Sequence, residues 1–453
     1  MALSFFKIKA LDGIVKPIRK SIYLVLLGNF MEYWDLMLGV HMSSVLSKVF
    51  LPVDDEYSAI TRAATFVMPL CLRPIATVFW GWYGDKHGRV KILSYTMVFT
   101  ASCCFLLTIL PSYAQWGMAS MICFFLLRGI QSVMATGENG AADVYITELV
   151  KAPQGYFVAS LVEVSCTLGG FFACLVAALS MFIDPLTGWK IAFGIGSTFA
   201  FLGAYIRKNL KETSDFIAFS EKREADFKKI VLKQTETLKN SYVIRNIASC
   251  ALIHVYVGMF FYVKFAFFTS VLEESFGLSS GWILINSACL LLLSAVLEFG
   301  IGLLSLRVHP MKIVKVLHFC GIVFCLLFSM LPNLQSSIQM VIFLQAFFYI
   351  FALGVLPTLP NYIKTYSINK RMKSHMGALT ISKTIIYLFT AYICVLISDI
   401  SVILLIMAGA ATVSFLGAFL FKAPKLTPLE EACDDAVICL NRIEDLKKNM
   451  LIF

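Results

Sequence analysis

One polar turn near the start of the chain separates two long apolar runs: Gly81-Trp82-Tyr83-Gly84-Asp85-Lys86-His87-Gly88-Arg89-Val90-Lys91. Glycine allows helix ends to turn sharply and approach closely, and Asp85 and Arg89 supply opposite charges that interact with helix ends. The pattern predicts two membrane helices joined by a turn that acts as a latch, or, more simply, a polar loop at the membrane surface. We expect the latch to comprise Gly81, Gly84, Asp85, Gly88 and Arg89.

The composition is that of a membrane protein. Hydrophobic residues occupy 59% of the 453 positions and charged residues 15%, which leaves too little polar surface for a soluble globule. The 13 cysteines are scattered, without a CxxC pair or a Cys/His metal spacing. We therefore expect no disulfide framework, no metal and no cofactor.

Apolar runs of about 20 residues, the length that crosses a bilayer, recur along the whole chain. We expect twelve transmembrane helices in two sets of six. The first set covers residues 21–46, 59–83, 91–110, 115–136, 155–181 and 188–206. The second set covers residues 245–270, 281–305, 312–331, 336–360, 376–397 and 400–421.

Polar segments divide the chain into five parts. We expect a basic cytoplasmic N-terminus (1–20), an N-terminal six-helix half (21–206), a basic cytoplasmic linker (207–244), a C-terminal six-helix half (245–421) and a cytoplasmic tail (422–453). Most of the 38 Lys and Arg residues lie in the terminal segments and in the loops after even-numbered spans. This alternation fits the positive-inside rule with both termini cytoplasmic. The net charge of +10 thus follows from topology, and no nucleic-acid partner is needed to explain it.

Short motifs in the N-terminal half narrow the interpretation. They are Gly28-Asn29-Phe30-Met31-Glu32-Tyr33-Trp34-Asp35, Arg73-Pro74-Ile75, the turn at 81–91, Arg128-Gly129-Ile130-Gln131, Gly137-Glu138, Trp189-Lys190-Ile191-Ala192-Phe193, and Arg207 with Glu212-Thr213 and Phe216. As an ordered set they resemble the metabolite:H+ symporter family of the major facilitator superfamily, which includes proline/betaine, α-ketoglutarate, citrate and shikimate permeases. The resemblance implies an all-α membrane fold of two pseudo-symmetric six-helix halves that rock about a midplane site.

The C-terminal half departs from this resemblance. Where the family repeats its turn after span 8, the chain reads Gly302-Leu303-Leu304-Ser305-Leu306-Arg307-Val308-His309-Pro310. Leu306 replaces the Asp, and His309-Pro310 replaces the Gly-Arg pair. Because both halves shape the substrate site, the substrate and the retention of proton coupling stay open.

Two acids in the first span are candidates for carrying the transported proton. A charged residue within a span costs about 2.5–3.5 kcal/mol and persists where it is paired or faces a water-filled cavity. Glu32 and Asp35 are three residues apart, on one helix face near the middle of the span. Two carboxylates this close repel, so we expect one of them to hold a proton. The alternative is an acid paired with a buried arginine, for which Arg128 is the candidate.

Spans 4 and 5 add further candidates. Arg128 offers a planar fork that grips a substrate carboxylate or holds an acid of the first span, and Gln131 and Glu138 lie on the same helix. Glu163, in span 5, matches an acid of the osmolyte-transporting branch of the family. That match favours a zwitterionic substrate.

The second half contributes fewer charged candidates. Lys264, flanked by Phe and Tyr residues, either contributes to the cavity, extends its ammonium to the membrane surface, or pairs with a nearby acid. His254, Glu298 and Lys383 also lie within or near spans. For His254, a hydrogen-bonded core position is the simpler interpretation.

The C-terminal tail spaces its apolar residues at alternating steps of four and three over residues 429–450. This pattern is typical of an amphipathic helix on the membrane surface, and a short coiled coil is the alternative. We therefore expect a monomer, with a tail-mediated dimer as the alternative.

The sequence as a whole predicts a proton-coupled importer of a small polar organic solute, either an osmolyte such as proline or betaine or a carboxylate. We expect it in a bacterial inner membrane, driven by the proton gradient, with the solute, protons and membrane lipid as its partners. An uncoupled facilitator or exchanger is one alternative, and a sensor or receptor derived from a transporter is another. No nucleophile–base motif, metal-ligand set or nucleotide loop suggests an enzyme.

Overall fold

A computed structural model describes residues 14–422 except 53–64, 66, 185–186, 208–209, 211, 214–239, 332–333, 335–336, 352, 367–369 and 398. The expected tail after residue 422, most of the expected linker, Phe216 and the first 13 residues lie outside the described part of the chain.

All secondary-structure elements described in the N-terminal half are helices. Its elements are α1 (Lys16–His41), α2 (Ser43–Phe50), η4 (Met68–Leu72), α4 (Arg73–His87), α5 (Arg89–Ile109), α6 (Tyr113–Trp116), α7 (Met118–Leu149), α8 (Gln154–Ile183) and α9 (Gly188–Arg207).

The C-terminal half is helical in the same way. Its elements are α12 (Asn240–Tyr262), the π-helical η5 (Val263–Phe267), α13 (Phe268–Glu274), α14 (Ser280–Ser305), α15 (Pro310–Ser329), α16 (Ile338–Phe351), η6 (Leu356–Thr358), α17 (Leu359–Ile363), α18 (Arg371–Leu396) and α19 (Ile400–Leu420).

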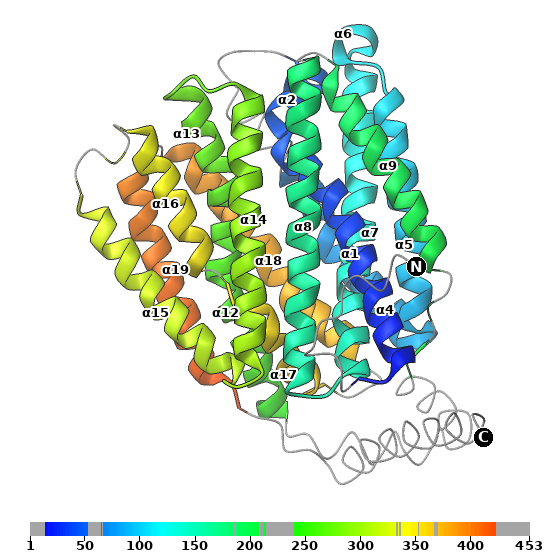
Figure 1. Ribbon diagram of the computed structural model, residues 1–453, viewed down its shortest axis with the longest axis vertical. Helices are drawn as coiled ribbons and strands as arrows, with labels where there is room; N and C mark the ends of the chain where they lie inside the picture. The colour runs from blue at the N-terminus through cyan, green and yellow to red at the C-terminus, as the bar shows by residue number, and fades with distance from the viewer. Residues whose placement is uncertain are drawn as a thin grey trace.

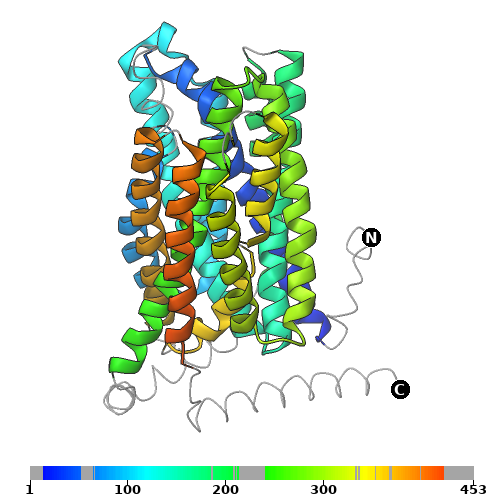
Figure 2. The ribbon, with the colours of Figure 1, turned by 90° about the vertical axis from the view of Figure 1, so that its left-hand side faces the viewer.

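The two halves form two helical bundles that stand side by side (Figure 1). The N-terminal bundle, in blue to teal, meets the C-terminal bundle, in green to orange, along α8 and α14, which pack against each other. A second seam joins α4 to α18. Figure 2, turned by 90°, shows the long helices running roughly parallel through the height of the molecule.

The helices suit a membrane. Among the described residues, nine helical segments are long and apolar enough to cross a bilayer. The other three expected spans, α1, α4 and α9, pack in the same bundle although their composition is less apolar. Large apolar side chains such as Ile183 and Met330 are exposed on the outside, as on a lipid-facing surface. The predicted all-α membrane fold of two halves is confirmed.

Several expected spans have different boundaries, among them the first, the fourth and the tenth. The first is two helices, because α1 ends at His41 and α2 begins at Ser43. The fourth runs to Leu149 rather than to residue 136, since the polar residues that interrupt its apolar run are buried inside the bundle. The tenth is broken after α16 by Gly354, whose φ of 85° lies in the left-handed region that favours glycine.

Candidate substrate cavity

A cavity of about 220 Å³ lies between the two halves. Helices α1, α4, α7 and α8 line one side of it, and α12, η5, α14, α18 and the segment around η6 line the other. Its ionisable lining residues are Glu32, Asp35, Arg73, Arg128, Asp143, Glu163, His254, Lys264, Glu298, His375 and Lys383. The cavity is small beside the about 300–1,000 Å³ typical of drug-sized ligands, and its lining carries charges of both signs.

The expected candidates Asp35, Gln131 and Arg128 form one hydrogen-bonded chain on this lining. Gln131 Nε2 donates to the two carboxylate oxygens of Asp35 at 3.1 and 2.9 Å. Arg128 Nη1 donates to Gln131 Oε1 at 2.9 Å. All three side chains are buried. Arg128 is therefore linked to Asp35 through the side-chain amide of Gln131. This is an indirect form of the expected pairing between a buried arginine and an acid of the first span.

Gly39 leaves space for the guanidinium of Arg128 in this hydrogen-bonded series. A Cβ atom added to Gly39 would lie 1.8 Å from Arg128 Nη2, so the guanidinium occupies the space where a larger residue would place its side chain. The close approach of α1 to α7 at this level depends on that glycine.

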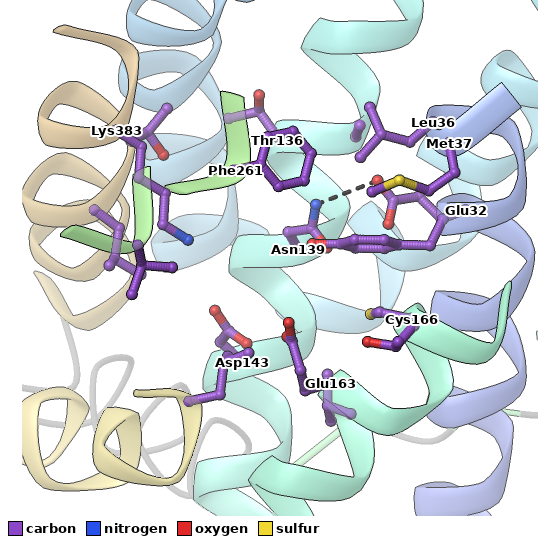
Figure 3. A pocket seen from close by; sticks show the side chains of 18 of the residues that line it. Glu32, Leu36, Met37, Thr136, Asn139, Asp143, Glu163, Cys166, Phe261 and Lys383 are labelled. Atoms are coloured by element: carbon purple, nitrogen blue, oxygen red, sulfur yellow. Dashed lines mark hydrogen bonds between the residues drawn. The ribbon is translucent and has the colours of Figure 1, made fainter. Parts of the chain in front are cut away.

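Glu32 lies on the same face of α1 and reaches a different partner. Its Oε1 accepts a hydrogen bond from Asn139 Nδ2 at 3.2 Å, drawn as a dashed line in Figure 3. Its Oε2 is buried and has no hydrogen-bond partner among the described residues. One of its two oxygens is thus available to a proton.

Glu138 does not line the cavity. It forms an ion pair with Arg207 in which both side chains are almost fully buried. Arg207 also donates to the carbonyl oxygen of Leu93 at 3.0 Å and to Asn29 Oδ1 at 3.3 Å. These contacts join α1, α5, α7 and α9, so the Glu138 side chain stabilises the packing of four helices. Glu138 was expected at the transport site, but it lies outside the cavity lining.

Lys264 contributes to the cavity from the π-helical segment η5. Its Nζ lies 4.2 Å from the ring centroid of Phe265, 4.3 Å from that of Tyr349 and 4.8 Å from that of Phe260. Such cation–π contacts stabilise an ammonium away from bulk water. Gln345 Nε2 donates to the Lys264 carbonyl oxygen at 2.9 Å, as expected where a π-helical turn alters the backbone hydrogen bonding.

Two acids on the seam between the bundles differ in their surroundings. Glu298 of α14 accepts hydrogen bonds from Thr167 of α8 and from Ser294, each at 2.8 Å. Glu163 points into the cavity (Figure 3), and the described residues give its carboxylate neither a hydrogen bond nor an ion pair. Lys383 of α18 points into the same space.

The turn at 81–91 contacts the C-terminal half. Asp85 accepts hydrogen bonds from the backbone N–H groups of Met372, at 3.0 Å, and Lys373, at 3.1 Å, in the first turn of α18. The turn therefore contacts the helix that corresponds to the eleventh expected span, just before residue 376, where that span was expected to begin. A Cβ atom on Gly81 would lie 2.8 Å from Lys373 Cα, so this glycine permits the close approach.

Further polar contacts surround that turn. Arg89 Nη1 donates to the carbonyl oxygen of Gly84 at 3.1 Å, and its Nη2 pairs with Glu148 Oε1 at 2.9 Å. Arg371 of the other half reaches the same Glu148 oxygen at 3.2 Å. Gly88, with a φ of 96°, joins α4 to α5.

The equivalent turn of the second half lacks this arrangement. Ser305 Oγ donates to the carbonyl oxygen of Gly302 in its own helix, and Leu306 occupies the position of the acid. A hydrogen bond between neutral side chains joins α8 to α17, in which Tyr156 Oη donates to Asn361 Oδ1 at 2.7 Å. The two seams therefore differ in chemistry.

The halves also touch at the opposite end of the cavity. Lys48 of α2 pairs with Glu273 of α13 at 3.2 Å, and the rings of Phe182 and Trp282 meet edge to face with centroids 5.9 Å apart. The two halves therefore contact each other at both ends of the cavity.

The comparisons with known proteins agree with this geometry. The sequence model described as "Major Facilitator Superfamily" matches residues 58–384. The chain belongs to the Major Facilitator Superfamily. Members of this superfamily are transporters rather than enzymes, as expected from the sequence.

Several curated relatives are bacterial osmolyte transporters. The chain is 29% identical over 272 residues to the proline/betaine transporter of Salmonella typhimurium, covering 57% of this chain and 53% of that protein. It is 31% identical over 214 residues to a glycine betaine/proline/ectoine/pipecolic acid transporter of Dickeya dadantii, covering 46% of this chain and 42% of that protein. The matches thus span about half the length of these relatives, and the resemblance to the metabolite:H+ symporter family is confirmed.

Solved superfamily structures share the fold at low sequence identity. The proton:xylose symporter XylE, bound to 6-bromo-6-deoxy-D-glucose, has a TM-score of 0.72 at 13% identity over 89% of this chain and 95% of that one. The human organic anion transporter MFSD10 has a TM-score of 0.62 at 16% identity over 90% and 100% of the two chains.

Several lining residues were not among the candidates from sequence. Asn139 and Asp143 follow residue 136, the expected end of the fourth span. His375, whose Nε2 lies 3.1 Å from Asp143 Oδ2, precedes the expected start of span 11. The spacing of Asn139 and Asp143, four and eight residues after Ala135 on one helix face, was the signal for the first two.

Proposed function

We propose that the chain is a proton-coupled symporter that imports a small polar organic solute by alternating access. One observation carries the proposal: the cavity between the halves holds two carboxylates of one helix, Glu32 and Asp35, in a lining with charges of both signs. Charged groups at this depth are retained where they bind substrate or protons. The relatives named as proline/betaine transporters support a solute of that class, with small carboxylates as the other class.

Asp35, with Glu32 beside it, is the proposed proton site. As a carboxylate, Asp35 is held by both Gln131 contacts, and Arg128 orients the amide that makes them. A protonated Asp35 carries no charge and offers one hydroxyl donor in place of an acceptor, so the amide contacts weaken. Proton binding is thereby linked to the packing of α1 against α7, which is the requirement for coupling.

The turn at 81–91 is the proposed gate on the cytoplasmic side. Asp85 binds the first turn of α18, where free backbone N–H groups and the helix dipole favour a carboxylate. Releasing this contact separates α4 from α18 and opens the cavity to that side. The positive-inside distribution of Lys and Arg places this end in the cytoplasm of a bacterium, with both termini there and the helices in the inner membrane.

A second candidate is transport without proton coupling, by a facilitator or exchanger. It is favoured by one observation, the loss of the acid at Leu306 in the second-half turn. The third candidate is not a transporter but a sensor that binds the solute without moving it. The same observation, the missing acid at Leu306, favours it.

Uptake by purified protein in proteoliposomes separates these candidates. The solutes are labelled proline, glycine betaine, α-ketoglutarate, citrate and shikimate, each with and without an inward proton gradient. A symporter of the proposed class concentrates proline or glycine betaine when the gradient is present. Equal equilibration without the gradient identifies a facilitator, binding without uptake identifies a sensor, and accumulation of a dicarboxylate alone assigns the other solute class.

A further inference from the structure

We propose that Lys383, rather than Arg128, binds the carboxylate of the transported solute, and that the cationic group of the solute faces Glu163. This inference deepens the proposed function and rests on it. Four Lys and Arg residues line the cavity, namely Arg73, Arg128, Lys264 and Lys383, and they differ in how far a ligand can reach them.

Three of these cations already have partners. Arg73 Nε donates to Ser132 Oγ at 3.1 Å, and Arg128 donates to Gln131. The Lys264 ammonium lies within 6 Å of the centroids of four aromatic rings, with Tyr349 at 4.3 Å from its Nζ. Each is thus stabilised within the protein, and a substrate carboxylate would have to compete for it.

Lys383 is different. It is half-buried, and the described part of the chain gives its ammonium no hydrogen bond, ion pair or ring contact. Figure 3 shows the side chain extending from α18 into the cavity. Glu163 and Lys383 attract each other electrostatically, but no hydrogen bond or ion pair within the described residues satisfies the ammonium, so it is available to an anion.

Its position on α18 belongs to a continuous lining face. Met376, Leu379, Thr380, Lys383 and Tyr387 all line the cavity, at the three- and four-residue steps that place side chains on one side of a helix. This face moves with the C-terminal half. A solute bound to Lys383 and to the first half therefore contacts both bundles at once, as alternating access requires.

The opposite wall supplies a matching free acid. Glu163 of α8 points into the cavity (Figure 3), and within the described residues its carboxylate accepts no hydrogen bond, whereas Asp35 accepts from Gln131 and Glu32 from Asn139. Lys383 and Glu163 do not form an ion pair with each other. A solute with only a negative charge would bind Lys383 and leave Glu163 without a hydrogen-bonded partner. A solute with only a positive charge would bind Glu163 and leave Lys383 without one. A zwitterion satisfies both.

Aromatic side chains complete this arrangement. Phe261 and Tyr387 also line the cavity, and the Phe261 ring centroid lies 5.9 Å from Lys264 Nζ. Ring faces attract alkylated ammonium groups and pack against the apolar carbons of a small solute.

The test compares matched pairs of solutes in proteoliposomes. Labelled L-proline and glycine betaine are transported in competition with two analogues that lack the carboxylate, L-prolinamide and choline. The variants are Lys383→Gln, Lys383→Arg and the control Lys315→Gln, which removes a lysine that lies over Phe419 at 3.8 Å and does not line the cavity. Detergent size-exclusion profiles establish that each variant is folded.

We expect Lys383→Gln to raise the KM for proline or glycine betaine about tenfold or more, the loss typical of one charge-assisted hydrogen bond. Its preference for proline over prolinamide should fall to near one. Lys383→Arg should keep most of that preference, and Lys315→Gln should match the wild type. Arg128→Lys should slow transport while keeping the preference for the carboxylate.

Three results would overturn the inference. A Lys383→Gln protein with wild-type KM and wild-type selectivity would show that the carboxylate binds elsewhere, while the proposed symport stands. Equal competition by prolinamide and proline in the wild type would do the same without any variant, even if Lys383→Gln fails to fold. A wild type that takes up neither zwitterion would remove the proposed solute class and the inference with it.

Discussion

Gln131 holds Asp35 through both carboxylate oxygens, with Nε2 at 3.1 and 2.9 Å from them. One amide nitrogen thus donates to both oxygens of the acid that we assign to the proton. The amide is oriented in turn, because its oxygen accepts from Arg128 at 2.9 Å. The consequence is that residues of α7 control the proton site on α1.

The first prediction concerns Arg128→Lys. A lysine carries the charge but lacks the rigid guanidinium fork, so the Gln131 amide loses its orientation and Asp35 loses its fixed contacts. We expect the initial rate of gradient-driven uptake to fall at least about tenfold, as for a lost charge-assisted hydrogen bond. Near wild-type uptake by a folded Arg128→Lys protein would contradict this.

The second prediction concerns Gly39→Ala. The new methyl group would lie 1.8 Å from Arg128 Nη2, and such overpacking costs about 1–3 kcal/mol or displaces the arginine. Uptake should therefore fall as it does in Arg128→Lys. The matched control is Gly194→Ala, where nothing lies within 4 Å of the added atom. Equal uptake by the two alanine variants is the outcome that argues against the packing described here.

The third prediction separates Glu138 from the transport site. Glu138→Gln leaves Arg207 buried without its counter-charge, a change worth about 3–5 kcal/mol of stability. Thermal unfolding in detergent should shift to lower temperature, while the KM of the surviving protein should stay close to the wild-type value. The double variant Glu138→Leu/Arg207→Met removes both charges and should recover part of the loss. If Glu138→Gln changed the KM and left the unfolding temperature unchanged, Glu138 would have a role in transport.

The fourth prediction concerns the Asp85 contact with α18. Asp85→Asn removes the charge that the N-terminus of α18 favours, so the cavity should open more often to the cytoplasmic side. Cys166 lines the cavity and is buried. In a protein whose other cysteines are replaced, an impermeant maleimide added from that side should label Cys166 faster in Asp85→Asn. Ser305→Ala, in the second-half turn, is the control and should not change the labelling rate. Unchanged labelling in Asp85→Asn would exclude the gate.

The sequence predicted the fold well because insertion in a bilayer requires long apolar runs. The expected span 281–305, for example, agrees with α14 to within one residue. The end of the fourth span was predicted too early, because Glu138 and Asn139 are polar and interrupt the apolar run. In the structure both residues are inside the helix, and their partners, Arg207 and Glu32, lie on other helices. Such pairings between distant segments are set by tertiary packing, which no local pattern contains.

The candidate site was predicted in part for the same reason. Asp35 and Arg128 stood out because charges within apolar runs are rare. Gln131 was named for its helix, but its place between them depends on how α1 and α7 face each other. Lys383 was noted as a charge within a span, and its lack of a partner became visible only with the cavity.

Measuring proton entry together with solute uptake shows whether the two are coupled at Asp35. Wild-type and Asp35→Asn proteins are placed in proteoliposomes loaded with a pH-sensitive dye, under an inward proton gradient, and labelled proline or glycine betaine is added. We predict that the wild type concentrates the solute as protons enter, that a protonophore abolishes the accumulation, and that Asp35→Asn retains solute exchange without accumulation. Uphill accumulation by Asp35→Asn, or wild-type accumulation without proton entry, would contradict the account.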